Sequence, residues 1–560
     1  MRILSSFASR KSLFPVAMGP VALGPMALAS AALGLCLVCA TVLAQDIPTV
    51  RMENGASQLL VHGKPFLALA GELGNSSSGT AAEADTILPR LEKLHFNTVL
   101  IPVAWSEIES AEGRFDFSIP DHWIDVAREQ HMHLVFLWFG SWKNAFSEYA
   151  PAWVLADTTR FPRAIAVDGH PLEILSTLGE QTARADANAY AALMAHLRQK
   201  DATEQTVLFV QVENEAGYVG LGGRDRSAEA DKLFGEQVPA QLTAYLSSHR
   251  DLLPPELAAN FHAGAGAWRE VFGDAADEIF MAWHYGLFVE QVAKAGKAAY
   301  PLPMYMNAQL PAPFEAPGDY PSGGPHPLYQ AAYRAAAPSI DFYSPDIYWP
   351  DFARWVNLYQ AAGNPVFVPE ARPDAAPGNA LYAIGEARGF GFSPFGVDAL
   401  DDSGTGHAIS EAYAALAELS DAILAAQQQN KIRALVLSST DPRPSQTVAL
   451  GGYRFRAMLA RTWPARELAA TQGGMLAIET APDEFLIAGS GLTVDFVRDP
   501  DTDLRIAGIA GIEQLAYSDG KWTTARVLNG DQSDQGRRLL MDAHEFHIYR
   551  VRLYAYSGGN

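Results

Sequence analysis

The sequence predicts an α/β fold, a (β/α)8 TIM barrel followed by a small antiparallel β-domain. Three observations carry this prediction. Eight short apolar runs alternate with helical patterns over roughly 370 residues, which is typical of a closed parallel barrel. Two of the runs end in glutamate, as strands that open into a barrel's active site do. After about residue 430, alternating and turn-rich segments replace the helical patterns.

The eight apolar runs are the expected barrel strands. In chain order they are 66–73, 96–105, 133–142, 207–215, 302–309, 340–349, 365–371 and 389–397. Helical patterns lie between most of them, at 83–94, 120–130, 188–200, 228–249, 278–296 and 407–429. An open doubly wound sheet is the alternative. It would call for a glycine-rich phosphate-binding turn after an early strand, and the sequence contains none.

The C-terminal part reads as β-structure. Alternating runs occur at 434–438, 474–479, 485–488, 492–498, 521–528 and 545–556, and turn signals such as Ala481-Pro482-Asp483 separate them. We therefore expect a catalytic barrel over 45–430 and a β-sandwich-like domain over 431–560. Capping of the barrel, oligomerisation and glycan binding are open roles for the second domain.

Residues 1–44 predict a secretory signal peptide. Arg2, Arg10 and Lys11 precede a long alanine-rich apolar run, and a small-residue cleavage site ends at Ala44. An uncleaved membrane anchor is the alternative, but prolines and glycines leave roughly 18 clean residues, near the lower limit for a span. Export to the periplasm or the medium is the expectation.

Cysteine usage and charge limit the chemistry. Both cysteines, Cys36 and Cys39, lie inside the expected signal peptide, so the mature chain has neither disulfides nor cysteine-based metal or thiol sites. Without residues 1–44 the chain keeps 38 basic and 63 acidic side chains, a net charge of −25. Such a surface repels nucleic acid and anionic membranes and suits a neutral substrate. We expect no metal and no organic cofactor.

The fourth expected strand, 207–215, runs from apolar residues into acids. Side chains alternate along a strand, so Glu213 and Glu215 would share one face, with Asn214 on the other face or in a terminal kink. Glu215 would lie nearest the barrel mouth, where it is either a general acid/base or a buried acid paired with an arginine. Glu213, one layer deeper, is expected to be structural.

The seventh expected strand ends in Glu370. Pro369 precedes this residue and Arg372 follows closely, so the arginine would keep the carboxylate ionised, as a nucleophile requires. A rim salt bridge to Arg372 is the alternative role for Glu370. Strands four and seven face each other across a barrel mouth. A carboxyl separation of about 5–5.5 Å would indicate glycoside hydrolysis with retention of configuration.

Further polar and aromatic residues gather at the expected strand ends. Glu72 ends the first strand, and Asn144 follows the third. Five aromatic residues lie at such ends: Trp105, Trp138, Trp142, Tyr348 and Trp349. Aromatic rings stack on the apolar faces of sugars. We expect Trp142, Asn144, Tyr348 and Glu72 to contact substrate, although Glu72 could equally be a structural acid.

The end of the fourth strand reads Gln211-Val212-Glu213-Asn214-Glu215-Ala216-Gly217. It resembles the Gln-Val-Glu-Asn-Glu-Tyr-Gly signature of the glycoside hydrolase family 35 β-galactosidases, retaining enzymes of clan A. Segments 71–77, 104–109 and 138–144 resemble motifs of a bacterial branch that carries a small C-terminal β-domain. The resemblance implies that Glu215 is the acid/base, Glu370 the nucleophile and Asn214 a contact of the sugar 2-hydroxyl.

The sequence also departs from that family. Ala216 replaces the usual tyrosine, Pro102 stands where many relatives have a sugar-contacting tyrosine, and Asn144 stands near a glutamate that binds the distal hydroxyls. The expected activity is nevertheless an exo-β-galactosidase acting on a carbohydrate substrate, with homo-oligomerisation left open. Another clan A enzyme, such as an endo-mannanase or endo-glucanase, and a non-catalytic glycan-binding barrel are the alternatives.

Overall fold

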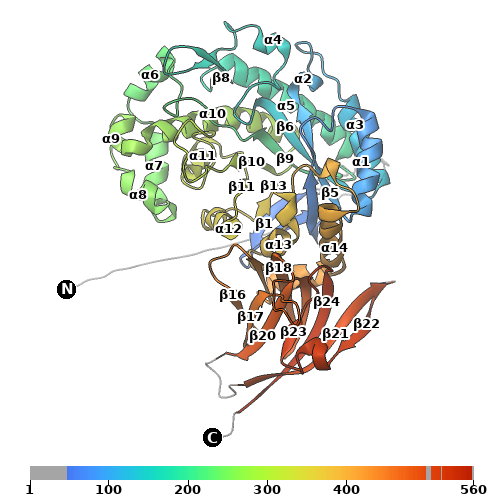
Figure 1. Cartoon of the computed structure of the whole chain (residues 1–560). Helices are drawn as coiled ribbons and strands as arrows, with labels where there is room; N and C mark the ends of the chain where they lie inside the picture. The colour runs from blue at the N-terminus through green and yellow to red at the C-terminus, as the bar shows by residue number, and fades with distance from the viewer. Residues whose placement is uncertain (1–46, 500–505, 519, 558–560) are drawn as a thin grey trace, which may run out of the picture. The chain divides into compact units, whose positions relative to one another are not determined.

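A computed structural model describes residues 47–499, 506–518 and 520–557 (Figure 1). The predicted signal peptide, residues 1–44, lies outside these residues. In the described part of the chain, no helix combines the length and apolar character needed to cross a membrane.

The predicted parallel barrel is confirmed. Its strand segments follow the order β12-β14-β4-β5-β6-β9-β10-β11-β13. Their bounds are β4 Ala68–Glu72, β5 Thr98–Ala104, β6 His133–Lys143, β9 Val207–Asn214, β10 Met304–Gln309, β11 Phe342–Ile347, β12 Phe367–Val368, β13 Glu370–Ala371 and β14 Gly391–Phe392. The two ends of this order, β12 and β13, are halves of one strand divided at Pro369, which has no N–H to donate to a ladder. The ring therefore closes with eight strands, one in each predicted run.

A helix follows each barrel strand, and the helices lie outside the strands in Figure 1. These helices are α1 Ala81–Lys93, α3 Ser118–Glu129, α5 Glu180–Asp201, α10 Ala276–Ala299, α11 Gln330–Ala336, α12 Phe352–Ala361, α13 Ala376–Leu381 and α14 Gly404–Glu418. Shorter helices lie in the connections: α2 Trp105–Ile108, α4 Ala152–Leu155, α6 Ala228–Gly235, α7 Ala240–Ser248, α8 Pro255–Asn260, α9 Trp268–Phe272 and α15 Ser420–Gln428. The helix predicted over 228–249 is two helices, α6 and α7, because Pro239 could not continue a helix and instead precedes α7.

Aromatic side chains fill the amino-terminal half of the barrel. The Phe209 ring lies 5.2 Å from Phe367, 5.7 Å from Tyr305 and 5.8 Å from Phe390, measured between ring centroids. An antiparallel sheet that the sequence analysis did not anticipate covers this end: β1 Thr49–Glu53, β2 Ala56–Val61 and β3 Lys64–Phe66. Its Leu59 packs in the same apolar cluster. This filling leaves the opposite end, at the carboxyl ends of the strands, for a site.

Two antiparallel sheets form the C-terminal region, as predicted. A six-stranded sheet has the order β15-β18-β19-β24-β21-β22, and a four-stranded sheet has the order β16-β17-β20-β23. The strands are β15 Ile432–Ser438, β16 Ser445–Leu450, β17 Tyr453–Leu459, β18 Gln472–Ala481, β19 Glu484–Ser490, β20 Leu492–Arg498, β21 Ile506–Ser518, β22 Lys521–Leu528, β23 Arg538–Leu540 and β24 His547–Tyr556. Phe455 of one sheet and Phe485 of the other pack 5.1 Å apart, so an apolar core lies between the sheets.

The aromatic filling of the barrel should dominate its stability. Phe209→Ala removes a fully buried ring and leaves a cavity, so we expect a loss of about 3–5 kcal/mol in the free energy of unfolding. Urea denaturation measures it. Phe314→Ala is the matched control, because Phe314 is 84% exposed and its loss should change stability by less than about 0.5 kcal/mol. Equal effects of the two substitutions would contradict this account of the core.

Candidate active site

A pocket of about 370 Å³ opens at the carboxyl ends of the barrel strands. Residues from several strand ends and the loops after them line it: Asn75, Lys143, Asn144, Glu215, Gln309, Leu310, Asp346, Tyr348, Trp349, Glu370 and Phe395. Four predicted site residues are among them, namely Glu215, Glu370, Asn144 and Tyr348. The segments that carry them are far apart in sequence, and the closed barrel brings them together.

The backbone kinks where β9 ends. Glu213 and Glu215 adopt left-handed conformations, with φ of +60° and +44°, which are unusual for such side chains and cost roughly 1–3 kcal/mol each. The prediction that Glu213 and Glu215 share one face of a regular strand is therefore wrong. The structure instead has the terminal kink that was the alternative. Glu213 turns away and accepts a hydrogen bond from the Trp142 amide at 2.8 Å. The adjacent residues Asn214 and Glu215 both reach the region of Glu370.

Glu215 is only 3% exposed and is held from two sides. The Asn144 amide donates to its carboxyl group, and its own backbone N–H donates to Asn307 Oδ1 at 2.9 Å. Burial and the nearby Glu370 charge raise the pKa of Glu215 to about 7, although Lys143 acts in the opposite direction. A carboxyl group with this pKa keeps its proton at neutral or weakly acidic pH and can donate it.

Glu370 has the surroundings of a carboxylate. Tyr348 donates its hydroxyl to Oε2 at 2.7 Å, and the amides of Asn307 and Asn214 lie 3.3 Å and 3.4 Å from Oε1. Hydrogen bonds of this kind favour the ionised form. The expected pairing with Arg372 is wrong, because the Arg372 guanidinium is exposed and bonds Asp374 at 2.6 Å and 3.0 Å. Amides and a phenol, not the neighbouring arginine, hold Glu370.

Three carboxyl groups converge in the pocket. One oxygen each of Glu215, Asp346 and Glu370 lie within 4.8 Å of one another. Such a triad could in principle hold a cation, but N–H and O–H donors already engage it: Asn307 donates to Asp346 at 2.8 Å, and Glu370 accepts three donors. The donor set fits carboxyl groups that share protons better than it fits a metal site.

Lys143 and Glu72 lie with this cluster. Burial alone would lower the pKa of Lys143. The negative charges of the nearby carboxylates, first Glu370 and then Glu215, outweigh burial and raise this pKa. Glu72 is fully buried, so burial and the Glu370 charge raise its pKa well above the ordinary value. Glu72 lies beside the carboxyl groups of Glu215 and Glu370 but does not line the pocket, so its contact with substrate stays a prediction.

The structure does not bring Trp142 into the pocket. Its indole is fully buried, donates to the Leu175 carbonyl at 3.1 Å, and packs against Tyr285 and Phe288. The predicted sugar contact of this ring is therefore wrong. Trp349 does line the pocket, and its indole N–H donates to the Leu310 carbonyl at 3.1 Å.

Two pocket residues, Asp346 and Lys143, and the buried Asn307 beside them were not predicted from the sequence. Asp346 is the next-to-last residue of β11, near the carboxyl end of the strand as Glu215 and Glu370 are, but it follows Ser344 and Pro345 instead of an unbroken apolar run. Lys143 lies between Trp142 and Asn144, the two residues for which the sequence predicted sugar contacts, and no pattern in the sequence indicated a role for the lysine itself. Asn307, inside β10, had no distinguishing pattern, because its role depends on contacts with β9, β11 and β13.

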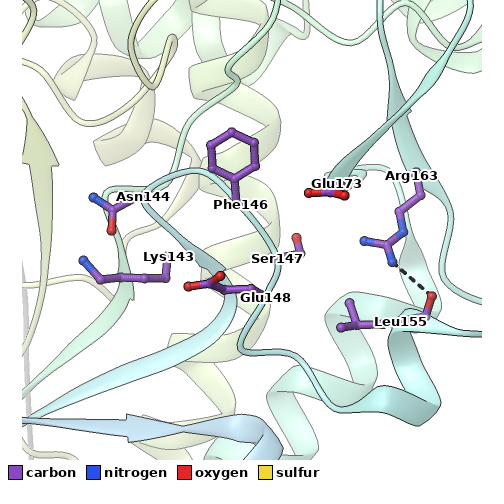
Figure 2. A pocket seen from close by; sticks show the side chains of 8 residues that line it. All are labelled: Lys143, Asn144, Phe146, Ser147, Glu148, Leu155, Arg163 and Glu173. Atoms are coloured by element: carbon purple, nitrogen blue, oxygen red, sulfur yellow. Dashed lines mark hydrogen bonds between the residues drawn. The ribbon is translucent and has the colours of Figure 1, made fainter. Parts of the chain in front are cut away.

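A second cavity of about 530 Å³ adjoins the pocket (Figure 2). It shares Lys143 and Asn144 with the first pocket, and its other lining residues are Phe146, Ser147, Glu148, Leu155, Arg163 and Glu173. Arg163 and Glu173 come from the hairpin of β7 Arg163–Ile165 and β8 Pro171–Leu175. The hairpin is thus one wall of the space beside Asn144, which bonds Glu215.

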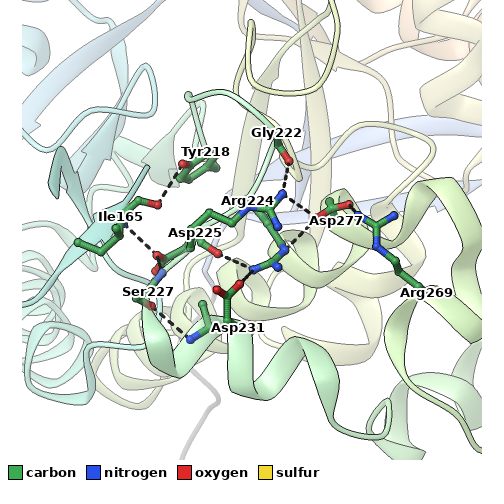
Figure 3. Close-up of polar contacts among 11 residues, drawn as sticks. Ile165, Tyr218, Gly222, Arg224, Asp225, Ser227, Asp231, Arg269 and Asp277 are labelled. Atoms are coloured by element: carbon green, nitrogen blue, oxygen red, sulfur yellow. Dashed lines mark hydrogen bonds and ion pairs between the residues drawn. The ribbon is translucent and has the colours of Figure 1, made fainter. Parts of the chain in front are cut away.

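A buried ion network ties this hairpin to the loop after Glu215 (Figure 3). Asp225 accepts from the Ile165 amide at 2.9 Å and from the Ser176 hydroxyl at 3.0 Å. Arg224, only 5% exposed, bonds Asp277 at 2.9 Å and the Asp225 carbonyl at 2.8 Å. These bonds hold the loop that follows Glu215 against the hairpin that forms one wall of the adjoining cavity.

Comparisons with known proteins give a family match over part of the chain. Residues 409–540 match a family described as a domain of unknown function, DUF5597. This span runs from within α14 to β23 and lies outside the residues that line the pocket. No curated protein sequence matches the chain.

Solved structures with similar folds are glycosidases at low identity. The catalytic domain of a β-amylase from Paenibacillus polymyxa is 12% identical over 61% of this chain and 96% of its own, with a TM-score of 0.43. A β-galactosidase from Halorubrum lacusprofundi is 12% identical over 63% of this chain and 58% of its own, with a TM-score of 0.42. An endo-1,4-β-mannanase from Rhizomucor miehei is 11% identical over 67% of this chain and its whole length, with a TM-score of 0.43. The geometry of the pocket, not these similarities, carries the functional proposal.

Removing the Lys143 charge should destabilise the protein in a pH-dependent way. Glu215 and Glu72 keep protons in the fold above the pH of about 4.3 at which an unfolded glutamate loses them, so stability falls as the pH rises toward about 7. Lys143→Met raises both pKa values further, so the loss of stability with rising pH becomes larger and continues to higher pH. We expect a loss of about 3 kcal/mol at pH 8 and clearly less at pH 5, measured by urea unfolding.

Lys232→Met is the matched control, because the Lys232 side chain is 75% exposed and its nearest carboxylate is 3.8 Å away. It should change stability by less than about 0.5 kcal/mol at either pH. An equal loss for Lys143→Met at both pH values would show that packing, not charge, explains its effect.

Proposed function

We propose that the chain is a retaining glycoside hydrolase that removes terminal non-reducing β-D-galactosyl residues from oligo- or polysaccharides. The observation that carries the proposal is the close approach of Glu215 and Glu370 in one pocket, where one carboxyl oxygen of each lies within 4.8 Å of one of the other. Inverting enzymes hold their carboxyl groups about 6.5–9.5 Å apart to admit a water, and retaining enzymes about 5–5.5 Å apart. The separation supports a covalent glycosyl-enzyme.

The two glutamates have surroundings suited to opposite roles. Glu370, bonded by Tyr348 and two amides, is the nucleophile that attacks the anomeric carbon. Glu215, with its raised pKa, protonates the leaving oxygen and afterwards deprotonates the attacking water. Asn214 lies beside the nucleophile, where its amide can bond the sugar 2-hydroxyl as attack proceeds.

Galactosyl specificity rests on the likeness of residues 211–217 to the family 35 signature. Asn144 and Trp349 supply polar and aromatic surface inside a pocket of about 370 Å³, a size that suits one sugar ring. Export, with removal of residues 1–44, and a separate C-terminal β-domain complete the proposal. Both rest on the sequence patterns described above.

Nucleophile replacement tests the role of Glu370. Glu370→Gly should reduce turnover of an aryl β-galactoside by at least about 10⁴-fold, because the covalent route is lost. Azide fits the vacated space and should restore turnover with an activated aryl galactoside, giving the α-galactosyl azide, identified by NMR. Glu236→Gly, on a half-exposed side chain away from the pocket, is the control and should keep wild-type rates. Full activity of Glu370→Gly would reject the assignment.

The proton on Glu215 predicts the pH dependence. The acid form is present below its pKa of about 7 and is lost above it, so kcat/KM on a galactoside with a poor leaving group should fall as the pH rises through about 7. A pH–rate profile measures this limb. Glu215→Gln should remove the limb and lower kcat/KM by about 10²–10⁴-fold, with a smaller loss on activated aryl galactosides. An unchanged limb in Glu215→Gln would assign it to another group.

A further inference from the structure

One cation faces four carboxyl groups at the barrel mouth. Glu72, Asp346, Glu215 and Glu370 are each at most 3% exposed, and Lys143 is 4% exposed. An uncompensated carboxylate in such a place costs several kcal/mol. Charge balance therefore supports one carboxylate opposite Lys143, and the other three carboxyl groups must be largely neutral.

Hydrogen-bond donors show which group carries the charge. Glu370 receives three donors, from Tyr348, Asn307 and Asn214. Neither oxygen of Glu72 has a hydrogen-bond partner in the described chain. Asp346 accepts from Asn307 on Oδ2 only, and its buried Oδ1 has no partner there. The resting charge therefore belongs to Glu370.

Of the two carboxyl groups that the proposed reaction does not use, Glu72 and Asp346, only Asp346 lines the pocket. One of its oxygens lies within 4.8 Å of an oxygen of Glu215 and of Glu370. The two carboxyl groups of Asp346 and Glu215 lie close enough to affect each other: Glu215 raises the pKa of Asp346, and Asp346 lowers that of Glu215. Two buried carboxyl groups this close would repel each other if both were ionised, so one of them keeps a proton.

We propose, on the basis of the retaining mechanism, that Asp346 is a positioning residue that remains a neutral carboxylic acid and donates a hydrogen bond to Glu215 whenever Glu215 is a carboxylate. In the first step a bond forms between Glu370 and the anomeric carbon, the bond to the leaving oxygen breaks, and the Glu215 proton passes to that oxygen. In the second step water attacks the same carbon, its proton passes to Glu215, and Glu370 leaves as a carboxylate.

The negative charge thus moves from Glu370 to Glu215 and back, always opposite Lys143. While Glu370 is esterified, Glu215 is a buried carboxylate that needs donors, and Asn144 and Asp346 supply them. Charge-assisted hydrogen bonds are about twice as strong as neutral ones. The other titratable groups that interact with Asp346 are Glu72, Lys143, and the phenols of Tyr348, Tyr305 and Tyr359.

Two substitutions separate a neutral donor from an anion. Asp346→Ala removes the donor, so kcat on an activated aryl galactoside should fall about 10²-fold, with a lower KM because the glycosyl-enzyme accumulates. Asp346→Asn supplies a neutral N–H donor of the same shape and should recover most of that loss. Asp374→Asn, at the exposed rim, controls for the chemical change. An Asn variant as slow as the Ala variant would overturn the proposal.

The pH profile gives opposite signs for the two states. A neutral Asp346 stabilises the Glu215 carboxylate, so Asp346→Ala should move the basic limb to higher pH and Asp346→Asn should leave it near the wild-type position. An ionised Asp346 would repel the Glu215 carboxylate, and both variants would then move the limb to lower pH. That downward shift would contradict the proposal.

An infrared measurement separates this proposal from the proposed function. At pH 8 the wild-type protein should show a carbonyl stretch from a protonated carboxylic acid that Asp346→Asn loses, with folding checked by circular dichroism. If the wild-type protein hydrolyses no galactoside, the proposed function fails while this result still judges the state of Asp346. Identical spectra of the two folded proteins would overturn the neutral assignment.

Discussion

The ammonium group of Lys143 opposite four buried carboxyl groups is the constraint on which the pocket depends. Four carboxylates in this place would repel one another and destabilise the fold. Without any carboxylate there would be no nucleophile to attack an anomeric carbon. One cation admits one carboxylate at low cost. Which carboxyl group carries that charge is set by donors: a phenol and two amides converge on Glu370, whereas Glu215 keeps a proton to near neutral pH.

The fold provides this arrangement at the cost of local irregularities. Pro369 divides the seventh strand, so its two halves pair with different neighbours and Glu370 begins the half that pairs with β11. At the end of β9, left-handed conformations turn Glu213 away, leave Glu215 in the pocket and place the Asn214 amide beside Glu370. Such strain persists only where surrounding contacts determine it, as the bonds of Glu215 to Asn144 and Asn307 do.

Apolar periodicity predicted the eight barrel strands, because buried parallel strands read as continuous hydrophobic runs that end at turns. It missed the short helices α11, α12 and α13, which have few turns in which to show a pattern. A glutamate at the end of an apolar strand was enough to single out Glu215 and Glu370. The predicted positions of Trp142 and Arg372 were wrong because other residues decide where their side chains lie: Phe288, far along the chain, packs against Trp142, and Asp374, two residues on, binds Arg372.

The central claim is that Glu370 forms a covalent bond to a galactosyl group. Incubation of the wild-type protein with 2-deoxy-2-fluoro-β-D-galactosyl fluoride, followed by intact-mass analysis and peptide mapping, tests it most directly, because the fluorine slows release of the intermediate. The account predicts one fluorogalactosyl group per chain, on the peptide that contains Glu370. A protein that turns over galactosides but gains no such mass, or gains it on another residue, would contradict the account.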